Sequence, residues 1–346
     1  MTLSDLLEVP PLSQAQAEPL QARLDGKAKP PKSLGRLEEL ALRVGMIQDS
    51  VEPHISSPAL IVFAGDHGLT RSGVAAFPSA VTVSMVDTLL AGKASANAIA
   101  SVVGAAVHVV DAGVAHDLSN RPTLIHRKIA WGTHDASVEP AMTKDQAEAA
   151  LLAGSAVAGR IIDDGADLIA LGEMGIGNSS PAALLIHRLT DAPLDVCVGP
   201  GAGHSDEGMA RKRSVLAKAA ARSDARDPLD VLIQFGGYEI AQMAGAIIEC
   251  AKRKVPVLID GFICSASALL AIRLAPAVQD YCIFTHASAE PGHAVLVEAL
   301  DARPLLQLDM RLGEGSGALL AIPLVKSACA ITNNVATLAD VLEAAR

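Results

Sequence analysis

Glycine stands beside an acid, a histidine or an amide at the end of nearly every short apolar run in the sequence. These run ends read GDHG (65–68), DAG (111–113), GEMGIGN (172–178), FGGYE (235–239), DGF (260–262) and THASAEPGH (285–293). Glycine lets the backbone approach a ligand closely, and carboxylates supply charge or act as bases. Because ligands of open parallel sheets bind outside the carboxyl ends of the strands, the run ends predict one binding crevice.

The segment RLGEGSG (311–317) contains the best candidate for a general base. Glu314 lies between two glycines, after a short predicted strand and before an apolar helical run. With no bulky neighbours, its carboxylate can be met closely by a substrate and can accept a proton from it. The alternative is an exposed glutamate in a turn.

The segment GEMGIGNSSP (172–181) predicts a turn from a strand into a helix. Gly175 and Gly177 permit an unusual backbone path, and Asn178 is placed to cap the helix. The free N–H groups of residues 179–180 would then point at an anion. The alternative is an ordinary strand–turn–helix junction.

A second glycine-rich turn, VGPGAGHSDEG (198–208), leads to the basic residues Arg211, Lys212 and Arg213. Such a run is most often a solvated helix face. In a chain with a formal net charge of −10, however, a lysine near two glycine-rich turns is a candidate phosphate contact. The turn does not match the dinucleotide fingerprint GxGxxG, which weakens the alternative of a nicotinamide-dependent oxidoreductase.

Metal and covalent chemistry find little support in the sequence. Asp66, His67, His286 and His293 can be imagined as ligands, but neither HExxH nor HxH occurs. The five cysteines form no CxxC pair, and no GxSxG elbow is present. We therefore expect neither a metal nor a cofactor.

Composition excludes several classes of partner. The acidic net charge and the few aromatic residues (Trp 1, Tyr 2, Phe 5) argue against nucleic acid. Charged residues interrupt every apolar stretch of about 18 residues, which argues against a membrane span. The odd cysteine count and an acidic N-terminus without a signal-like apolar core predict a cytoplasmic protein.

The elements that position these residues follow an alternating pattern from Leu60 onward. Short β-branched runs alternate with Ala-rich segments of helical period, as in βαβ units, and a helix is predicted over Tyr238–Lys252. This predicts a Rossmann-like α/β fold with a mostly parallel sheet and flanking helices. The expected strands cover residues 59–65, 106–113, 166–173, 231–237, 255–261 and 281–287.

Both ends of the chain depart from this pattern. Pro-rich joints separate polar helical stretches, of which Ser33–Gln48 is the clearer, and a last helix is expected over Leu338–Arg346. We therefore predict a small helical domain built from residues 1–50 and 325–346, beside an α/β catalytic domain of residues 51–324.

Several long segments, taken together and in order, resemble one family. They are KPPKSLGRLEELA (29–41), VFAGDHG (62–68), FPSAVT (77–82), PAMT (140–143), GEMGIGN (172–178), DGF (260–262), SAEPGH (288–293) and RLGEGSGALLAIPL (311–324). The sequence is similar to the nicotinate-nucleotide:dimethylbenzimidazole phosphoribosyltransferases, which make the lower-ligand nucleotide of cobalamin. The resemblance runs from about residue 28 to the end.

The resemblance implies a homodimer that transfers the phosphoribosyl group of nicotinate mononucleotide to 5,6-dimethylbenzimidazole. The products are α-ribazole 5′-phosphate and nicotinate. The pyridinium of the nucleotide is already a cationic leaving group, so its departure needs neither a metal nor a general acid. The family's catalytic glutamates match Glu314 and Glu173, and its phosphate-side residues match Gly175, Gly201, Lys212 and Ser288. Further substrate-binding candidates are Gly177, Asn178, Asp260, Leu312, Ser79 and Ser84.

The sequence departs from the family pattern at several positions. Many members read FPxEVTxQMV followed by GGAAIN, whereas here Ala80 replaces the acid, Ser84 the glutamine and Lys93 a glycine. Pro200 and Ala202 stand where Arg and Thr are common. The first cluster lies on the side where the family holds the acceptor base.

The acceptor base therefore stays open among dimethylbenzimidazole, another benzimidazole, adenine and a phenol. A nucleotide-binding protein without turnover is the alternative from another class. The presence of Glu314 and Glu173 argues against it, because a binding module needs no desolvated base.

Overall fold

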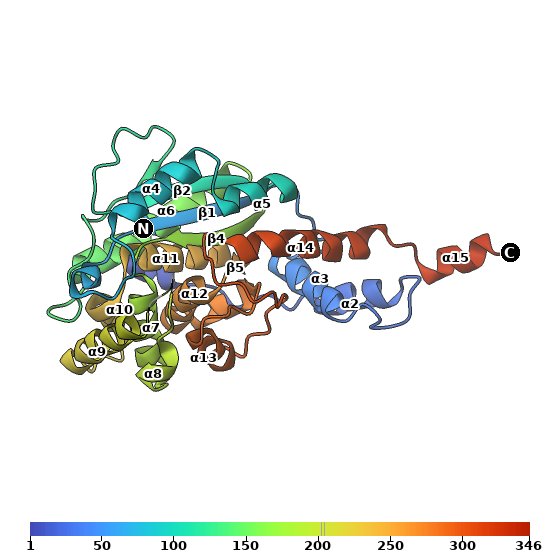
Figure 1. Cartoon of the computed structure of the whole chain (residues 1–346). Coiled ribbons are helices and arrows are strands. Elements are labelled where there is room, and N and C mark those ends of the chain that lie inside the picture. The colour runs from blue at the N-terminus through green and yellow to red at the C-terminus, as the bar shows by residue number, and fades with distance from the viewer. Residues whose placement is uncertain (202, 204) are drawn as a thin grey trace.

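The computed structural model describes residues 1–201, 203 and 205–346, and its centre is a parallel sheet (Figure 1). The six strands lie in the order β3-β2-β1-β4-β5-β6, and every neighbouring pair is parallel. The carboxyl ends of all strands therefore meet at one edge of the sheet, as predicted. The strands are β1 (Pro58–Gly65), β2 (Ala106–Gly113), β3 (Ile125–His126), β4 (Leu168–Met174), β5 (Val257–Ile259) and β6 (Cys282–Phe284).

Two apolar layers cover opposite faces of this sheet. Alternate side chains of β1 enter different layers, with Ile61 and Phe63 in one and Leu60 and Val62 in the other. This period of two explains why the strand is apolar throughout: both faces are buried. The first layer contains α1 (Leu3–Leu7), α6 (Lys144–Asp163), α7 (Ser179–Thr190), α10 (Pro228–Phe235), α11 (Tyr238–Lys252) and α12 (Phe262–Leu274). The second contains α3 (Arg36–Ile47), α4 (Ala80–Leu90), α5 (Ser95–Val103) and α14 (Ser316–Asn334).

The remaining elements of the described residues complete the chain. They are α2 (Ala17–Asp25), α8 (Leu194–Cys197), α9 (Asp206–Arg222), α13 (Gly292–Ala299), α15 (Leu338–Ala344) and the 3₁₀ helices η1 (Gly68–Ser72) and η2 (Pro276–Tyr281). The α/β fold predicted from the alternating pattern is confirmed, and α11 has the predicted bounds.

The strand expected over 231–237 is wrong, because these residues form most of α10. The Asp227 side chain accepts hydrogen bonds from the backbone N–H groups of Leu229 (3.0 Å) and Asp230 (3.2 Å), and Pro228 occupies the first turn. An aspartate cap followed by proline starts a helix, which outweighs the strand-like apolar run. The short strand expected before Glu314 is also not formed: residues 307–313 lack regular structure.

Residues 26–28 and 335–338 lie side by side beyond the end of α14, far from the N-terminus itself (Figure 1). Ala28 N–H donates to the Ala336 carbonyl (2.9 Å), Leu338 N–H to the Gly26 carbonyl (2.9 Å) and the Lys27 ammonium to the Val335 carbonyl (2.8 Å). Helices α2 and α3 pack on α14, whereas α1 packs on α6 and α11. The division into residues 1–50 with 325–346 and residues 51–324 stays a prediction, since α14 crosses it as one helix.

Helix α14 is long and apolar enough to cross a membrane by length and composition alone. In the described part of the chain, 56% of the most apolar 18-residue stretch of this helix is buried inside the fold. Such burial is typical of a core helix.

Candidate active site

A cavity of about 310 Å³ opens at the carboxyl edge of the sheet, beside the ends of β4, β5 and β6. Strand β1 has β2 on one side and β4 on the other, so the chain reverses direction across the sheet at this point. Ligands of such folds bind at this reversal. Nine residues predicted from the sequence line the cavity: Glu173, Gly175, Gly177, Asn178, Gly201, Asp260, Ser288, Leu312 and Glu314.

Glu314 sits in a tight turn at the start of α14 and is only 6% exposed. Its φ of 61° lies in the left-handed region, which non-glycine residues rarely adopt. Its Oε2 accepts a hydrogen bond from Ala96 N–H (3.1 Å), in the first turn of α5. A Cβ on Gly172 would lie 2.5 Å from the Glu314 carbonyl carbon, so glycine in β4 permits the turn to approach the sheet. The alternative of an exposed turn glutamate is therefore wrong.

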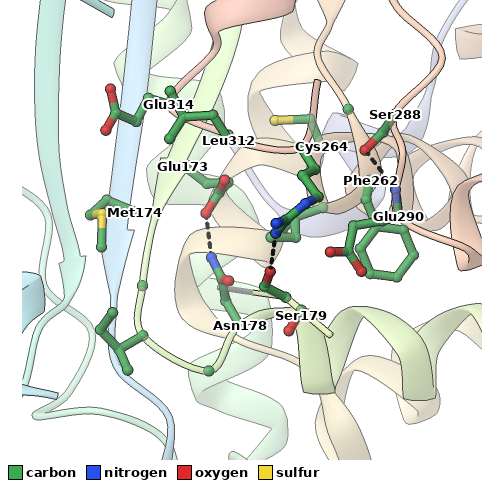
Figure 2. A pocket seen from close by; sticks show the side chains of 18 of the residues that line it. Glu173, Met174, Asn178, Ser179, Phe262, Cys264, Ser288, Glu290, Leu312 and Glu314 are labelled. Carbon is green, nitrogen blue, oxygen red and sulfur yellow. Dashed lines mark hydrogen bonds between the residues drawn. The ribbon is translucent and has the colours of Figure 1, made fainter. Parts of the chain in front are cut away.

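Glu173 is the second buried carboxyl of the cavity, at the end of β4 (Figure 2). Burial, together with the charges of Asp260, Glu239 and Glu314, raises the pKa of Glu173 to about 8. A hydrogen bond from Asn178 Nδ2 acts in the opposite direction. At neutral pH this carboxyl thus keeps its proton. Asn178 occupies the N-cap position of α7, as predicted, but its side chain makes no cap bond to the helix and donates to Glu173 instead.

Asp260, at the end of β5, lines the cavity and also holds the start of α14. Its Oδ1 accepts from the N–H groups of Gly317 (2.8 Å) and Ala318 (3.1 Å). Burial raises the pKa of Asp260, while His286 and these N–H groups act in the opposite direction. The carboxylate thus fixes the helix whose first turn follows Glu314.

Lys212 is buried beneath the cavity, although its neighbours Arg211 and Arg213 are exposed. The alternative of a solvated face is therefore wrong for Lys212. Its Nζ donates to the Gly199 carbonyl (2.8 Å) and to Ser179 Oγ (3.0 Å). Burial lowers the pKa of Lys212 to about 8, and the charge of Glu290 opposes this. The Lys212 side chain supports Ser179, which lines the cavity.

Two charged lining residues, Glu290 and Arg311, were not predicted as site residues. Burial raises the pKa of Glu290, while Lys212 and Arg311 lower it. Arg311 Nη1 donates to the Gly201 carbonyl (2.9 Å). Both residues lie within motifs quoted above, Glu290 in SAEPGH and Arg311 in RLGEGSG, and their place in these motifs was the available signal.

Ser288 is held by a neutral histidine. Its N–H donates to His293 Nδ1 (3.1 Å), and burial together with His286 lowers the pKa of His293 to about 4. The imidazole therefore remains a hydrogen-bond acceptor at neutral pH. Figure 2 shows Ser288 and Glu290 across the cavity from Glu314 and Met174.

The cavity also has an apolar wall. It consists of Val74, Phe77, Val81 and Met85, of which Val81 and Met85 lie one turn apart on α4. This i, i+4 spacing was the signal that sequence reasoning missed.

The structure does not bring Ser79 or Ser84 into the cavity lining: Ser84 is exposed and Ser79 half-buried. Ala80 and Lys93 are also exposed. Ala202 lies outside the described residues, and Pro200 is half-buried.

The described residues contain no group of three or more His, Cys, Asp or Glu side chains placed to hold a metal ion. Asp66 and His67, imagined above as ligands, have other partners. His67 Nε2 lies 2.9 Å from Glu239 Oε1, and Asp66 accepts hydrogen bonds from Thr82 and Ala115.

Comparison with known proteins places this chain in a family. The profile of a phosphoribosyltransferase family matches residues 9–341. A nicotinate-nucleotide–dimethylbenzimidazole phosphoribosyltransferase from Cupriavidus taiwanensis is 51% identical over 331 residues, which cover 95% of this chain and 96% of that protein. The protein of the same name from Ralstonia nicotianae is 51% identical over 329 residues, covering 94% of this chain and 93% of that protein.

A solved structure shows the same fold. The crystal structure of CobT from Thermus thermophilus is 43% identical, with a TM-score of 0.90, and the match covers 93% of this chain and 97% of that one. The sequence relatives and the structural likeness both extend over nearly the full length. The chain therefore belongs to the nicotinate-nucleotide–dimethylbenzimidazole phosphoribosyltransferase family.

Proposed function

We propose that this chain transfers the 5-phosphoribosyl group of nicotinate mononucleotide to 5,6-dimethylbenzimidazole. The observation that carries the proposal is the position of Glu314. Its buried carboxylate lies at a cavity with an apolar wall and a charged side that includes Arg311. An aromatic base and a nucleotide phosphate can therefore occupy one cavity with a general base beside them.

The reaction needs one proton transfer and one displacement at C1′. The bond from C1′ to the pyridinium nitrogen breaks, and its electron pair leaves with nicotinate, whose pyridine ring thereby becomes neutral. A ring nitrogen of the acceptor base forms the new bond from the opposite face, which inverts β to α. Glu314 accepts the proton from the second ring nitrogen, so the product ring becomes neutral. Holding both substrates in line supplies much of the remaining acceleration.

Glu173, neutral near pH 7, suits a different role. A protonated carboxyl can donate one hydrogen bond and accept others, as a ribose hydroxyl requires. We assign Glu173 to the ribosyl group, between the base and the phosphate. Its neutral state also keeps a second negative charge away from Glu314, so that only one carboxylate accepts the proton.

The phosphate would lie on the charged side of the cavity. Lys212 and Arg311 supply positive charge, and Gly201, Gly175 and the Ser288 backbone line the space beside them. Helix α7 begins here, at Ser179. Backbone N–H groups at a helix N-terminus favour an anion. No metal or cofactor enters this scheme, since the pyridinium is already a good leaving group.

We further propose a cytoplasmic homodimer that acts without nucleic acid or membrane. Helix α15 extends from the body of the protein (Figure 1) and leaves Leu338, Val341 and Leu342 52%, 46% and 57% exposed. These residues share one face, at i, i+3 and i+4, and a second chain would cover them. Light scattering should give twice the 35.5 kDa chain mass, and Val341→Asp should lower it toward the monomer.

Another acceptor base is the second candidate, because Ala80, Ser84 and Lys93 depart from the family pattern, although none of the three lines the cavity. A turnover assay with nicotinate mononucleotide and a panel of bases tests both. We expect product with dimethylbenzimidazole, and a much higher kcat/KM with adenine or a phenol would favour the second candidate. If none of these bases led to the release of nicotinate, the proposed function would be contradicted.

A further inference from the structure

The aspartate of the GDHG motif does not line the cavity, although it ends the central strand β1. Asp66 is 2% exposed, and both of its oxygens have partners. Oδ1 accepts from Thr82 Oγ1 (2.7 Å), and Oδ2 accepts from Ala115 N–H (2.8 Å). The carboxylate thus joins the end of β1 to α4 and to the loop that follows β2.

Thr82 extends this connection to the loop after β4. Its side chain is fully buried, and its Oγ1 accepts a hydrogen bond from Ile176 N–H (3.2 Å) while donating to Asp66. A hydroxyl can do both at once, which an apolar side chain of the same shape cannot. Three segments distant in sequence therefore meet at one oxygen atom.

The two segments that Thr82 connects, α4 and the loop of residues 174–178, both line the cavity. Val81 and Met85, on either side of Thr82 in α4, belong to the apolar wall. Ile176 lines the cavity from the loop of residues 174–178. The Asp66–Thr82–Ile176 connection therefore sets the distance between the wall and this loop.

We propose that Asp66 and Thr82 are positioning residues that fix the width of the slot for the acceptor base. This inference rests on the proposed function, in which the aromatic base lies against the apolar wall. A flat ring gains most when it contacts both sides of its slot. Without the Thr82 hydroxyl, the buried Asp66 Oδ1 and the buried Ile176 N–H would both lose their hydrogen-bond partner. Helix α4 would then shift so that one of these groups finds a new partner.

The substitution Thr82→Val keeps the shape of the side chain and removes the hydroxyl. We expect the dissociation constant of dimethylbenzimidazole, measured by calorimetry, to rise by about 10-fold, and that of nicotinate mononucleotide to change by less than about 2-fold. Thr82→Ser retains the hydroxyl and should stay within about 3-fold of the unmodified chain for both ligands.

A matched control lies on the same helix. Thr88 Oγ1 donates to the Ser84 carbonyl (2.7 Å), within α4, so Thr88→Val removes a hydroxyl without releasing another segment. We expect no change in either constant. If Thr82→Val does not fold, Thr82→Ala makes the same comparison, since it removes the hydroxyl without adding an apolar group.

An equal loss of affinity for both ligands in Thr82→Val would overturn the inference, as would unchanged affinity for the base. Failure of Thr82→Ser to restore base binding would also contradict it. These binding measurements require no turnover. If the variants change base binding as expected but the unmodified chain transfers no phosphoribosyl group, the proposed reaction is contradicted and the positioning role of Thr82 is not. No binding of dimethylbenzimidazole to the unmodified chain would overturn the assignment of the slot.

Discussion

The two sides of the cavity are built by different physics. On the charged side, Lys212 and Arg311 are held by hydrogen bonds to the carbonyl groups of Gly199 and Gly201. On the apolar side, Val81 and Met85 of α4 contact the cavity through apolar side chains, and the buried Thr82 between them ties α4 to Asp66 and Ile176. Directed bonds fix where a charge lies, whereas apolar packing mainly fixes how much space remains.

This difference predicts how the two sides respond to substitution. Loss of a buried charged partner leaves other groups unsatisfied and costs more than loss of a few methylene groups. Substitutions near the charges should therefore change catalysis or nucleotide binding strongly. Substitutions in the apolar wall should change the choice of base by smaller factors.

The largest effect is expected at Glu314. Glu314→Gln keeps an acceptor for Ala96 N–H but cannot accept a proton, so kcat should fall by roughly 10²–10⁴ with nucleotide binding largely retained. Steady-state kinetics with saturating substrates measure this. Glu298→Gln, an exposed glutamate on α13, is the matched control. Near-normal turnover of Glu314→Gln would refute the assignment.

Lys212→Ala tests the charged side. In the proposed function its buried ammonium supplies a charge for the 5′-phosphate, so we expect nicotinate mononucleotide to bind roughly 10- to 100-fold more weakly. Nicotinate riboside, which lacks the phosphate, should lose much less affinity. Calorimetry with both ligands makes the comparison, and Lys218→Ala, an exposed lysine on the same helix, controls for charge. Equal losses for both ligands would show that Lys212 acts only in the fold.

Glu173 gives a prediction about pH. Its pKa rises to about 8 in the folded chain, above the ordinary 4.5, so the folded state keeps a proton that the unfolded state releases. Folding stability should therefore fall as pH rises from about 5 to about 8, by roughly 2–4 kcal/mol from this group. Urea unfolding at both pH values measures the slope. Glu173→Gln should remove that part of it, and an unchanged slope would contradict the buried neutral carboxyl.

The smallest effects are expected at the apolar wall. Benzimidazole and dimethylbenzimidazole should differ in kcat/KM by less than roughly 10²-fold. Met85→Ala enlarges the slot and should change that ratio by roughly 3- to 10-fold, whereas Ser84→Gln, outside the lining, should change it less. Competition assays with both bases decide this. A larger effect of Ser84→Gln would show that the bound base reaches beyond the cavity lining.

Much of this architecture could be predicted because its signals are local. Strand β1 is apolar at every position, and five of the six run ends with glycine and acid follow strands at the carboxyl edge of the sheet, whereas FGGYE follows α10. The strand predicted over residues 231–237 was wrong because an apolar run is compatible with a buried strand or a buried helix. The signal that decides between them is the helix cap at Asp227.

The site was harder to predict, because its contacts join distant segments. The burial of Lys212 depends on carbonyl and hydroxyl groups that precede it by 13 and 33 residues. Glu314 meets Ala96 across 218 residues. Sequence motifs identify such residues as candidates, but only the folded structure shows which of their side chains line the cavity.

The configuration of the product tests the central claim most directly. The unmodified chain is mixed with nicotinate mononucleotide and dimethylbenzimidazole, and the anomeric configuration of the nucleotide formed is determined by proton NMR. Displacement in line, with Glu314 as the base, predicts the α-nucleotide and one nicotinate released for each. A β-nucleotide, or nicotinate released with free ribose 5-phosphate, would contradict it.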